Sequence, residues 1–190
     1  MLMKIIYTIV SKLKKFIFVP FCFGVFFLGC KEGKVRVYRI PKENILEGNL
    51  QWSVPSGWKE QGASGVRLAS FEAATAKGSA DVSVVMLPGS AGGILANINR
   101  WRGQVGLGPI DEKSLQSQLQ RVPSSAGELS LVDFSGVNSQ GDNSPVRMLA
   151  AILFDGETTW FFKTQGEPSV VIAVKPTFLE FLRSLRFAGK

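Results

Sequence analysis

The fold is decided by the stretch Val146-Arg-Met-Leu-Ala-Ala-Ile-Leu-Phe-Asp-Gly-Glu-Thr-Thr-Trp-Phe-Phe-Lys-Thr164. In residues 146–154 every second side chain is apolar, and this period is typical of a β-strand. Asp155-Gly156 follows, a dipeptide that favours the tight turn of a hairpin. Residues 158–164 are rich in threonine and aromatic side chains, which are common in strands. The stretch therefore predicts an antiparallel β-hairpin.

Further strands are expected on the N-terminal side of this hairpin. Turn-forming dipeptides at Ser56-Gly57 and Pro88-Gly89 separate short segments with the composition of strands. Residues 124–127 and 135–145 are predicted to be loops. The segments predicted to be strands are residues 51–54, 66–71, 81–87 and 129–134.

An amphipathic helix is predicted where the apolar residues stop recurring at every second position and recur instead at every third or fourth position. Ile94, Leu95, Ile98, Trp101 and Val105 recur at this spacing, so one face of the helix is expected to pack onto the sheet.

Two further helices are expected downstream. Residues 111–119 predict a short one, because acidic residues at its start favour a helix N-terminus. The last is expected to begin at Pro176, since proline is favoured in the first turn. Residues 169–174 fit either a helix or a strand, and a helix is preferred. Residues 50–190 are therefore predicted to form one α+β domain.

Four aromatic segments carry a resemblance to a known fold. They are Trp52-Ser-Val-Pro-Ser-Gly-Trp58, Asn97-Ile-Asn-Arg-Trp101, Trp160-Phe-Phe-Lys163 and Phe178-x-x-Phe181-Leu-x-x-Leu185-x-Phe187. With these segments, residues 50–187 resemble the PsbP/Mog type of α/β sandwich. The resemblance implies an antiparallel sheet packed by helices. Its members include photosystem extrinsic subunits, a Ran-binding nuclear factor and small uncharacterised bacterial envelope lipoproteins, so the fold implies almost no chemistry.

Residues 1–29 resemble the signal peptide of a bacterial lipoprotein. Four lysines and no acidic residue precede an uncharged, phenylalanine-rich stretch at residues 16–29. This stretch is shorter than the roughly 20 apolar residues of a spanning helix, so cleavage is preferred over an uncleaved anchor. Gly29-Cys30 matches the cleavage site of the family, with Cys30 as the residue that receives the lipid. Leu28 departs from the pattern, because a small residue is usual there.

Residues 30–49 are predicted to form a basic tether beside the lipid. Clustered cations near an anchor are attracted to anionic head groups by about 1 kcal/mol each. The alternative is a short edge strand, since charged edges discourage pairing between molecules. We expect a cell-envelope protein that faces the periplasm, and Lys31 directly after Cys30 favours the outer membrane. The basic residues expected to contact membrane lipid are Lys31, Lys34, Arg36, Arg39 and Lys42.

The composition excludes several classes of function. Four of the 22 basic residues precede Cys30, which leaves 18 basic against 15 acidic residues, and the basic residues after Lys42 are scattered singly. Nucleic-acid binding is therefore not expected. The chain has no histidine and no cysteine after Cys30, so mechanisms with a catalytic histidine and His-ligated zinc sites are excluded. No metal or cofactor is expected, because Asp133 and Asp142 with Asn138 and Asn143 lack the spacing of a calcium loop and are assigned to loops.

Enzymatic motifs are weak in this chain. Ser56-Gly-Trp-Lys59 and Lys163-Thr-Gln-Gly166 approach motifs of penicillin-interactive enzymes, but the first is interpreted as a turn. A mechanism that uses carboxylates alone, such as Asp81 or Asp133, is a minor alternative. It would require two acidic groups to converge in a cleft.

The loop at residues 89–93 and the helix after it form a candidate partner or anion-binding surface. Gly92 and Gly93 precede a helix whose backbone N–H groups can hold an anion, and Arg100 and Arg102 lie nearby in sequence. The alternative is a plain connector. Trp101 fits either a partner surface or the core, and the core is preferred. We expect a non-catalytic binding or assembly module, with a small-ligand-binding or sensory module that uses a cleft between sheet and helix as the alternative.

Overall fold

A computed structural model describes residues 50–139 and 141–189. Most of its strands belong to one antiparallel sheet of seven, in the order β2-β3-β4-β8-β7-β6-β5. These strands are β2 (Trp58–Gln61), β3 (Arg67–Thr75), β4 (Gly78–Pro88), β5 (Gln120–Ser124), β6 (Gly127–Val137), β7 (Pro145–Phe154) and β8 (Thr158–Gly166).

The predicted N-terminal features lie outside the described residues. These are the signal peptide with Gly29, the lipid site Cys30 and the basic tether at residues 30–49. Within residues 50–139 and 141–189, no helix has the length and hydropathy needed to cross a membrane.

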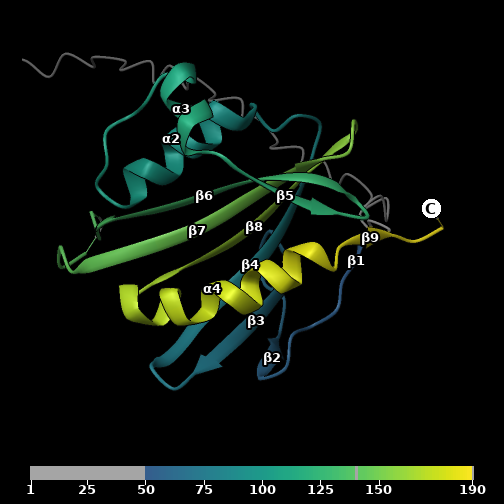
Figure 1. Ribbon diagram of the computed structural model, residues 1–190, viewed down its shortest axis with the longest axis horizontal. Helices are drawn as coiled ribbons and strands as arrows, with labels where there is room; N and C mark the ends of the chain where they lie inside the picture. Colours follow the sequence, from purple (N-terminus) through teal and green to yellow (C-terminus); the bar gives the residue numbers. More distant parts are fainter. Residues whose placement is uncertain (1–49, 140, 190) are drawn as a thin grey trace, which may run out of the picture. The chain divides into compact units, whose positions relative to one another are not determined.

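The hairpin predicted from residues 146–164 is confirmed as β7 and β8. Their register pairs Phe154 with Thr159, and the turn between them is held by Asp155. One oxygen of that carboxylate accepts hydrogen bonds from the backbone N–H groups of Glu157 at 3.0 Å and Thr158 at 2.7 Å. The hairpin lies near the middle of the sheet, where helices cover both of its faces (Figure 1).

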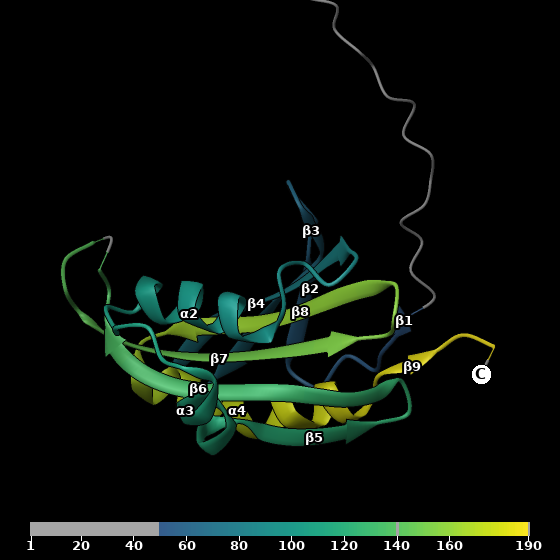
Figure 2. The same ribbon diagram turned by 90° about the horizontal axis from the view of Figure 1, so that it is seen from above.

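Helices lie on both faces of the sheet, which confirms the predicted α+β class. Helices α2 (Ile94–Gln104) and α3 (Glu112–Gln118) lie on one face, and α4 (Pro168–Arg183) lies on the other (Figures 1 and 2). A separate pair of short strands, β1 (Leu50–Gln51) and β9 (Arg186–Phe187), joins the two ends of the described chain.

The larger core lies between α4 and the sheet. Phe181 of α4 is completely buried at its centre. Its ring lies 5.3 Å from Trp58, 5.6 Å from Phe71 and 5.9 Å from Phe162 between centroids. Such aromatic contacts add to the stabilisation that burial alone provides.

A smaller core lies between the sheet and helices α2 and α3. Trp101 is 4% exposed, so the predicted core position is confirmed, and its ring meets Phe161 edge to face at 5.7 Å. The buried sheet residues of this core come from β6, β7 and β8. Helix α2 therefore covers part of its face of the sheet.

The end of α2 is fixed against β6 by a close backbone approach. The backbone N–H of Val137 donates to the carbonyl of Val105 at 3.0 Å. A Cβ at Gly136 would collide with the same carbonyl oxygen, so glycine permits this approach. The contact holds the last turn of α2, with Gln104, above the sheet.

The last helix begins eight residues earlier than predicted. Helix α4 starts at Pro168, with the Glu167 carboxylate accepting hydrogen bonds from the next backbone N–H groups, and Pro176 lies inside it. The expected start at Pro176 is therefore wrong, while the preferred helix at residues 169–174 is confirmed. Burial of Val171 and Val174 against the sheet outweighs the backbone hydrogen bond that a proline inside a helix removes.

The short outer strands differ most from the prediction. Residues 52–54 are not a strand, because β1 ends at Gln51, and β3 continues beyond residue 71 to Thr75. The predicted loop at residues 124–127 is a tight turn between two strands. The edge strands β2 and β5 were not predicted. Both carry residues that resist further pairing, namely Lys59, Glu60, Arg121 and Pro123.

Candidate binding site

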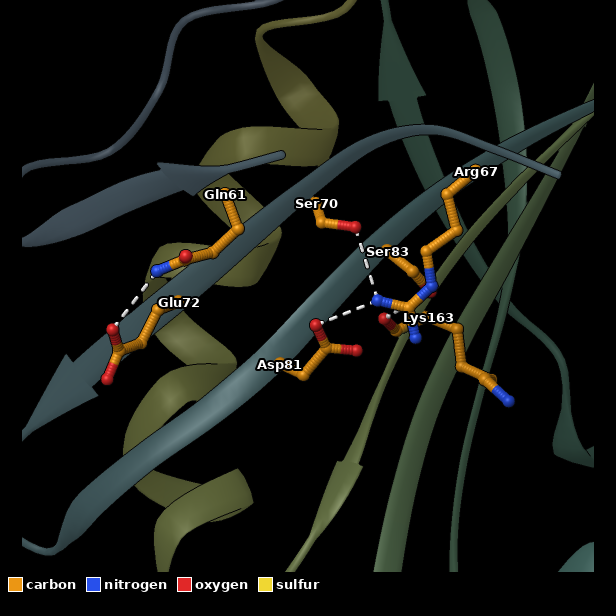
Figure 3. Close-up of polar contacts among 7 residues, drawn as sticks. All are labelled: Gln61, Arg67, Ser70, Glu72, Asp81, Ser83 and Lys163. Carbon is orange, nitrogen blue, oxygen red and sulfur yellow. Dashed lines mark hydrogen bonds and ion pairs between the residues drawn. The ribbon is translucent and has the colours of Figure 1, made fainter. Parts of the chain in front are cut away.

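The sheet face that carries α2 changes from polar to apolar along one row of paired residues. Its polar end, on β2, β3 and β4, is not part of the core under α2 (Figure 3). Its apolar end, on β7 and β6, lies in that core. Lys163 of β8 lies where the polar end of the row meets the apolar end. From the edge strand β2 to β6 the row contains Gln61, Ser70, Ser83, Lys163, Ala150 and Val132.

A cleft of about 380 Å³ lies at this transition, between α2 and strands β4 and β8. Its volume lies within the range of small-ligand sites. We call it the α2 cleft. Its lining residues are Val66, Ser83, Val85, Leu87, Arg100, Trp101, Gln104, Phe161 and Lys163.

Lys163 is the cation that projects from the floor of the α2 cleft. Its Nζ donates a hydrogen bond to Oε1 of Gln104, at 3.2 Å. In the described part of the chain, no carboxylate lies within ion-pair distance of this amine. Burial lowers the pKa of Lys163, the charges of Arg67 and Arg100 lower it further, and Asp81 opposes them. The amine is thus partly desolvated and repelled by its neighbours.

The two arginines beside Lys163 are held differently. Arg100 donates to the amide oxygen of Asn97 at 2.6 Å, and that amide donates to the carbonyl oxygens of Ala91 and Gly93. A neutral group therefore orients the Arg100 guanidinium without balancing its charge. Arg67 instead forms an ion pair with Asp81 at 2.9 Å (Figure 3). Two further cations thus act on Lys163, and Asp81 pairs with one of them, Arg67.

Replacing Lys163 by methionine is expected to stabilise the protein. Because its folded pKa is lowered, the charged amine costs free energy at every pH below that pKa. The cost disappears as the pH rises past the unfolded value of about 10.4. We expect Lys163→Met to raise the melting temperature by about 2–4 °C at pH 7, corresponding to about 1 kcal/mol. The gain should shrink towards pH 11, as thermal unfolding at several pH values would show.

Lys113→Met is the matched control for this measurement, because Lys113 is an exposed lysine on α3. This variant should leave the melting temperature nearly unchanged. A loss of stability in Lys163→Met that stays constant with pH would contradict the account of Lys163.

The structure brings together some of the predicted surface residues and separates others. Arg100 and Trp101 both line the α2 cleft. Arg102 points elsewhere, with hydrogen bonds to the Gly108 carbonyl at 2.8 Å and to Gln118 at 3.3 Å, so it joins α2 to the α3 segment. The glycines at residues 92 and 93 do not line the cleft, and both have positive φ angles, of 86° and 82°.

Lys163 and Arg67 were not predicted as site residues. A signal for Lys163 was present in the sequence, because it occupies a position on the same face of β8 as Phe161. Arg67 carries no comparable signal. It joins the site because β3 pairs with β4 through an irregular register between residues 67 and 69.

In the described part of the chain, no two acidic residues converge in the α2 cleft, as a carboxylate mechanism there would need. Asp81 lies on the α2 face, whereas Asp133 contacts Lys175 of α4 on the opposite face. Glu72 is the register partner of Asp81 and shares its face of the sheet, but neither carboxylate lines the cleft. Asp133 lies in β6, which confirms the strand predicted over residues 129–134, shows that the loop interpretation of this carboxylate is wrong, and places it in ion pairs with two cations.

Other motifs also take structural roles. Ser56 lies in a turn and Lys59 in β2, in agreement with the turn interpretation. In residues 50–139 and 141–189, no cluster of three or more acidic, cysteine or histidine residues could hold a metal ion.

Comparison with known proteins gives distant likenesses of fold. No protein-family model matches the chain, and no curated protein is similar to it in sequence. A protein from Bacteroides thetaiotaomicron matches with a TM-score of 0.48 and 10% identity over 74% of this chain, which spans 46% of that protein. LpqN, involved in cell envelope biogenesis of Mycobacterium tuberculosis, matches with a TM-score of 0.47 and 9% identity, over 72% of this chain and 82% of LpqN.

A third similar structure is cyanobacterial PsbP (CyanoP) from Synechocystis sp. PCC 6803. It matches with a TM-score of 0.42 and 16% identity, over 74% of this chain and 93% of CyanoP. These likenesses concern the fold, and at such identities they transfer no function.

Proposed function

We propose that this protein is a non-catalytic binding module, held at a bacterial envelope membrane by acylated Cys30, and that the α2 cleft is its recognition site. The observation that carries the proposal is the pair of cations Arg100 and Lys163 in the lining of the α2 cleft, where the partly desolvated Lys163 amine donates to the neutral amide of Gln104. A partly buried amine that is repelled by Arg67 and Arg100 and donates to a neutral amide is best explained by a ligand that balances its charge. This geometry favours the small-ligand function over a purely structural assembly role.

The membrane attachment is supported by the sequence pattern at the N-terminus. A basic segment, an uncharged stretch and Gly29-Cys30 occur in the order of a lipoprotein signal. A single acyl chain binds a membrane only weakly, so stable attachment usually needs a second contribution. The basic residues after Cys30 would supply that contribution at an anionic surface.

A binding role is also supported by the chemistry that the chain contains. No histidine is present as a general base or metal ligand. Asp81 and Asp133 are each engaged by cations and lie on opposite faces of the sheet. Neither carboxylate is placed to exchange a proton with the other.

Cys30→Ala is expected to abolish metabolic labelling with palmitate and to move the protein from the membrane fraction to the soluble fraction. Cys22→Ala is the matched control, because Cys22 follows the bulky Phe21 and is a poor cleavage site. The control should be labelled like the wild type. Equal labelling of Cys30→Ala would refute the anchor. Separation of the two membranes by density would test the preference for the outer membrane.

A further inference from the structure

We infer that the α2 cleft binds a small amphipathic anion, with a carboxylate or phosphate head near Lys163 and Arg100 and an apolar body against Val66, Val85 and Leu87. This inference rests on the proposed function, and it adds the chemical class of the ligand. It follows from the charge, the apolar lining and the size of the cleft.

The charge at the head position is uncompensated. Lys163 contacts the neutral amide of Gln104, and Arg100 contacts the neutral amide of Asn97. The charged groups that act on Lys163 are Arg67 from β3, Asp81 from β4 and Arg100 from α2. Asp81 is already paired with Arg67. An anionic oxygen could therefore accept charge-assisted hydrogen bonds from Lys163 and Arg100, and it would relieve their mutual repulsion.

The rest of the cleft suits an apolar body. Val85 and Leu87 provide partly exposed side chains from the sheet, while Trp101 and Phe161 line the cleft as nearly buried core residues. Val66 also lines the cleft and is 74% exposed, which is high for a large apolar side chain. A ligand that covered these groups would gain about 25 cal/mol for each Å² of apolar surface removed from water. An inorganic anion would leave that surface uncovered.

The number and placement of the cations favour a small anion over a polyanion. Arg102 is turned away towards Gly108 and Gln118, so it does not extend the basic site along α2. The volume of 380 Å³ also fits a single small molecule. A polymer would need a continuous basic surface.

The inference can be tested on the complete lipidated protein in phosphatidylcholine nanodiscs, with Lys163 as its own reporter. Reductive methylation is followed residue by residue by mass spectrometry, and Lys113 serves as the internal reference. The probes share one apolar body and differ in the head: phenylpropanoate, phenylpropyl phosphate, phenylpropanol and phenylpropylamine. Acetate supplies the head without the body.

We expect phenylpropanoate or phenylpropyl phosphate to protect Lys163 at concentrations at least about tenfold lower than phenylpropanol or acetate, with no protection by the amine. Whichever of these two probes protects Lys163 at the lower concentration identifies the head group as a carboxylate or a phosphate. Arg100→Gln should raise the protecting concentration by about tenfold or more, because it removes one charge-assisted contact. Arg183→Gln is the matched control, since Arg183 is exposed on α4, on the opposite face. It should leave protection unchanged.

Three outcomes would overturn the inference. Equal protection by phenylpropanol would show that the cleft binds ligands without using its charge, which leaves the proposed binding function in place. Equal protection by acetate would refute the apolar body. A failure of every probe to protect Lys163 would overturn both the ligand class and the cleft as recognition site, while palmitate labelling of Cys30 tests the anchor separately.

Discussion

Replacing Phe181 by alanine is expected to lower the free energy of unfolding by about 3–5 kcal/mol, which is the usual cost of truncating a buried phenylalanine. Phe181 has no exposed surface. Its ring contacts Trp52 at 6.0 Å and Trp58 at 5.3 Å, as well as Phe71 and Phe162. These partners come from the segment before β2 and from three strands. Truncation would therefore leave a cavity where several elements meet, and the surrounding rings could not all close it.

Urea denaturation followed by circular dichroism would measure this loss. The midpoint should fall, while the dependence of stability on urea concentration should stay the same if the native fold is retained. Ile172→Ala is the matched control on the same helix, because Ile172 is 52% exposed. It should change stability by no more than about 0.5 kcal/mol. A loss below about 1 kcal/mol for Phe181→Ala would mean that α4 does not pack as described.

Replacing Asp133 by asparagine is expected to lower the free energy of unfolding by about 2–4 kcal/mol. The Asp133 side chain is 7% exposed and forms ion pairs with Arg147 at 2.8 Å and Lys175 at 2.7 Å. Removing one partner of a buried pair costs about 3–5 kcal/mol. The cost should be somewhat smaller here, because the Arg147 and Lys175 side chains are 24% and 30% exposed.

The loss in Asp133→Asn should depend on pH. Burial alone would raise the pKa of Asp133, but hydrogen bonds and charges from Arg147 and Lys175 hold it below its usual value. A carboxylate with a lowered folded pKa contributes stability that is fully present above the unfolded value of about 3.9. That contribution is lost as the pH falls through the folded pKa. The difference between wild type and variant should therefore be constant near neutral pH and shrink below about pH 4.

Asp81→Asn is the matched control for Asp133→Asn. Asp81 also pairs with an arginine, but its side chain is 55% exposed. Exposed pairs contribute at most about 1 kcal/mol. Equal losses in the two variants would contradict the difference in burial between the two ion pairs.

The elements with a long, regular apolar pattern were predictable. The β7–β8 hairpin and α2 follow from residues 146–164 and 94–105, because each of these patterns is long enough to select one period. The edge strands β2 and β5 were missed since an edge carries charged residues and proline that obscure the alternation. The start of α4 was predicted too late in the sequence, because Pro176 was interpreted as a first-turn residue. The actual start is determined by burial of the residues before Pro176 against the sheet.

The candidate site was predictable in part. A ligand-binding cleft between sheet and helix near Arg100 was the alternative interpretation of the sequence, and Arg100 lines such a cleft in the structure. Lys163 could not be assigned to the same site, because its approach to Arg67 depends on the pairing of β3, β4 and β8. Residues that are nearly one hundred positions apart in sequence meet through this register.

The two edges of the main sheet also restrict how a protein partner could bind. Many domains capture an extended peptide by adding it as a further strand. Here β2 presents Lys59 and Glu60, and β5 carries Pro123, whose nitrogen has no proton to donate. A partner chain would gain few backbone hydrogen bonds at either edge. A peptide that binds by adding a strand is therefore not expected to bind at either edge of the sheet. A partner would instead contact the faces of the sheet.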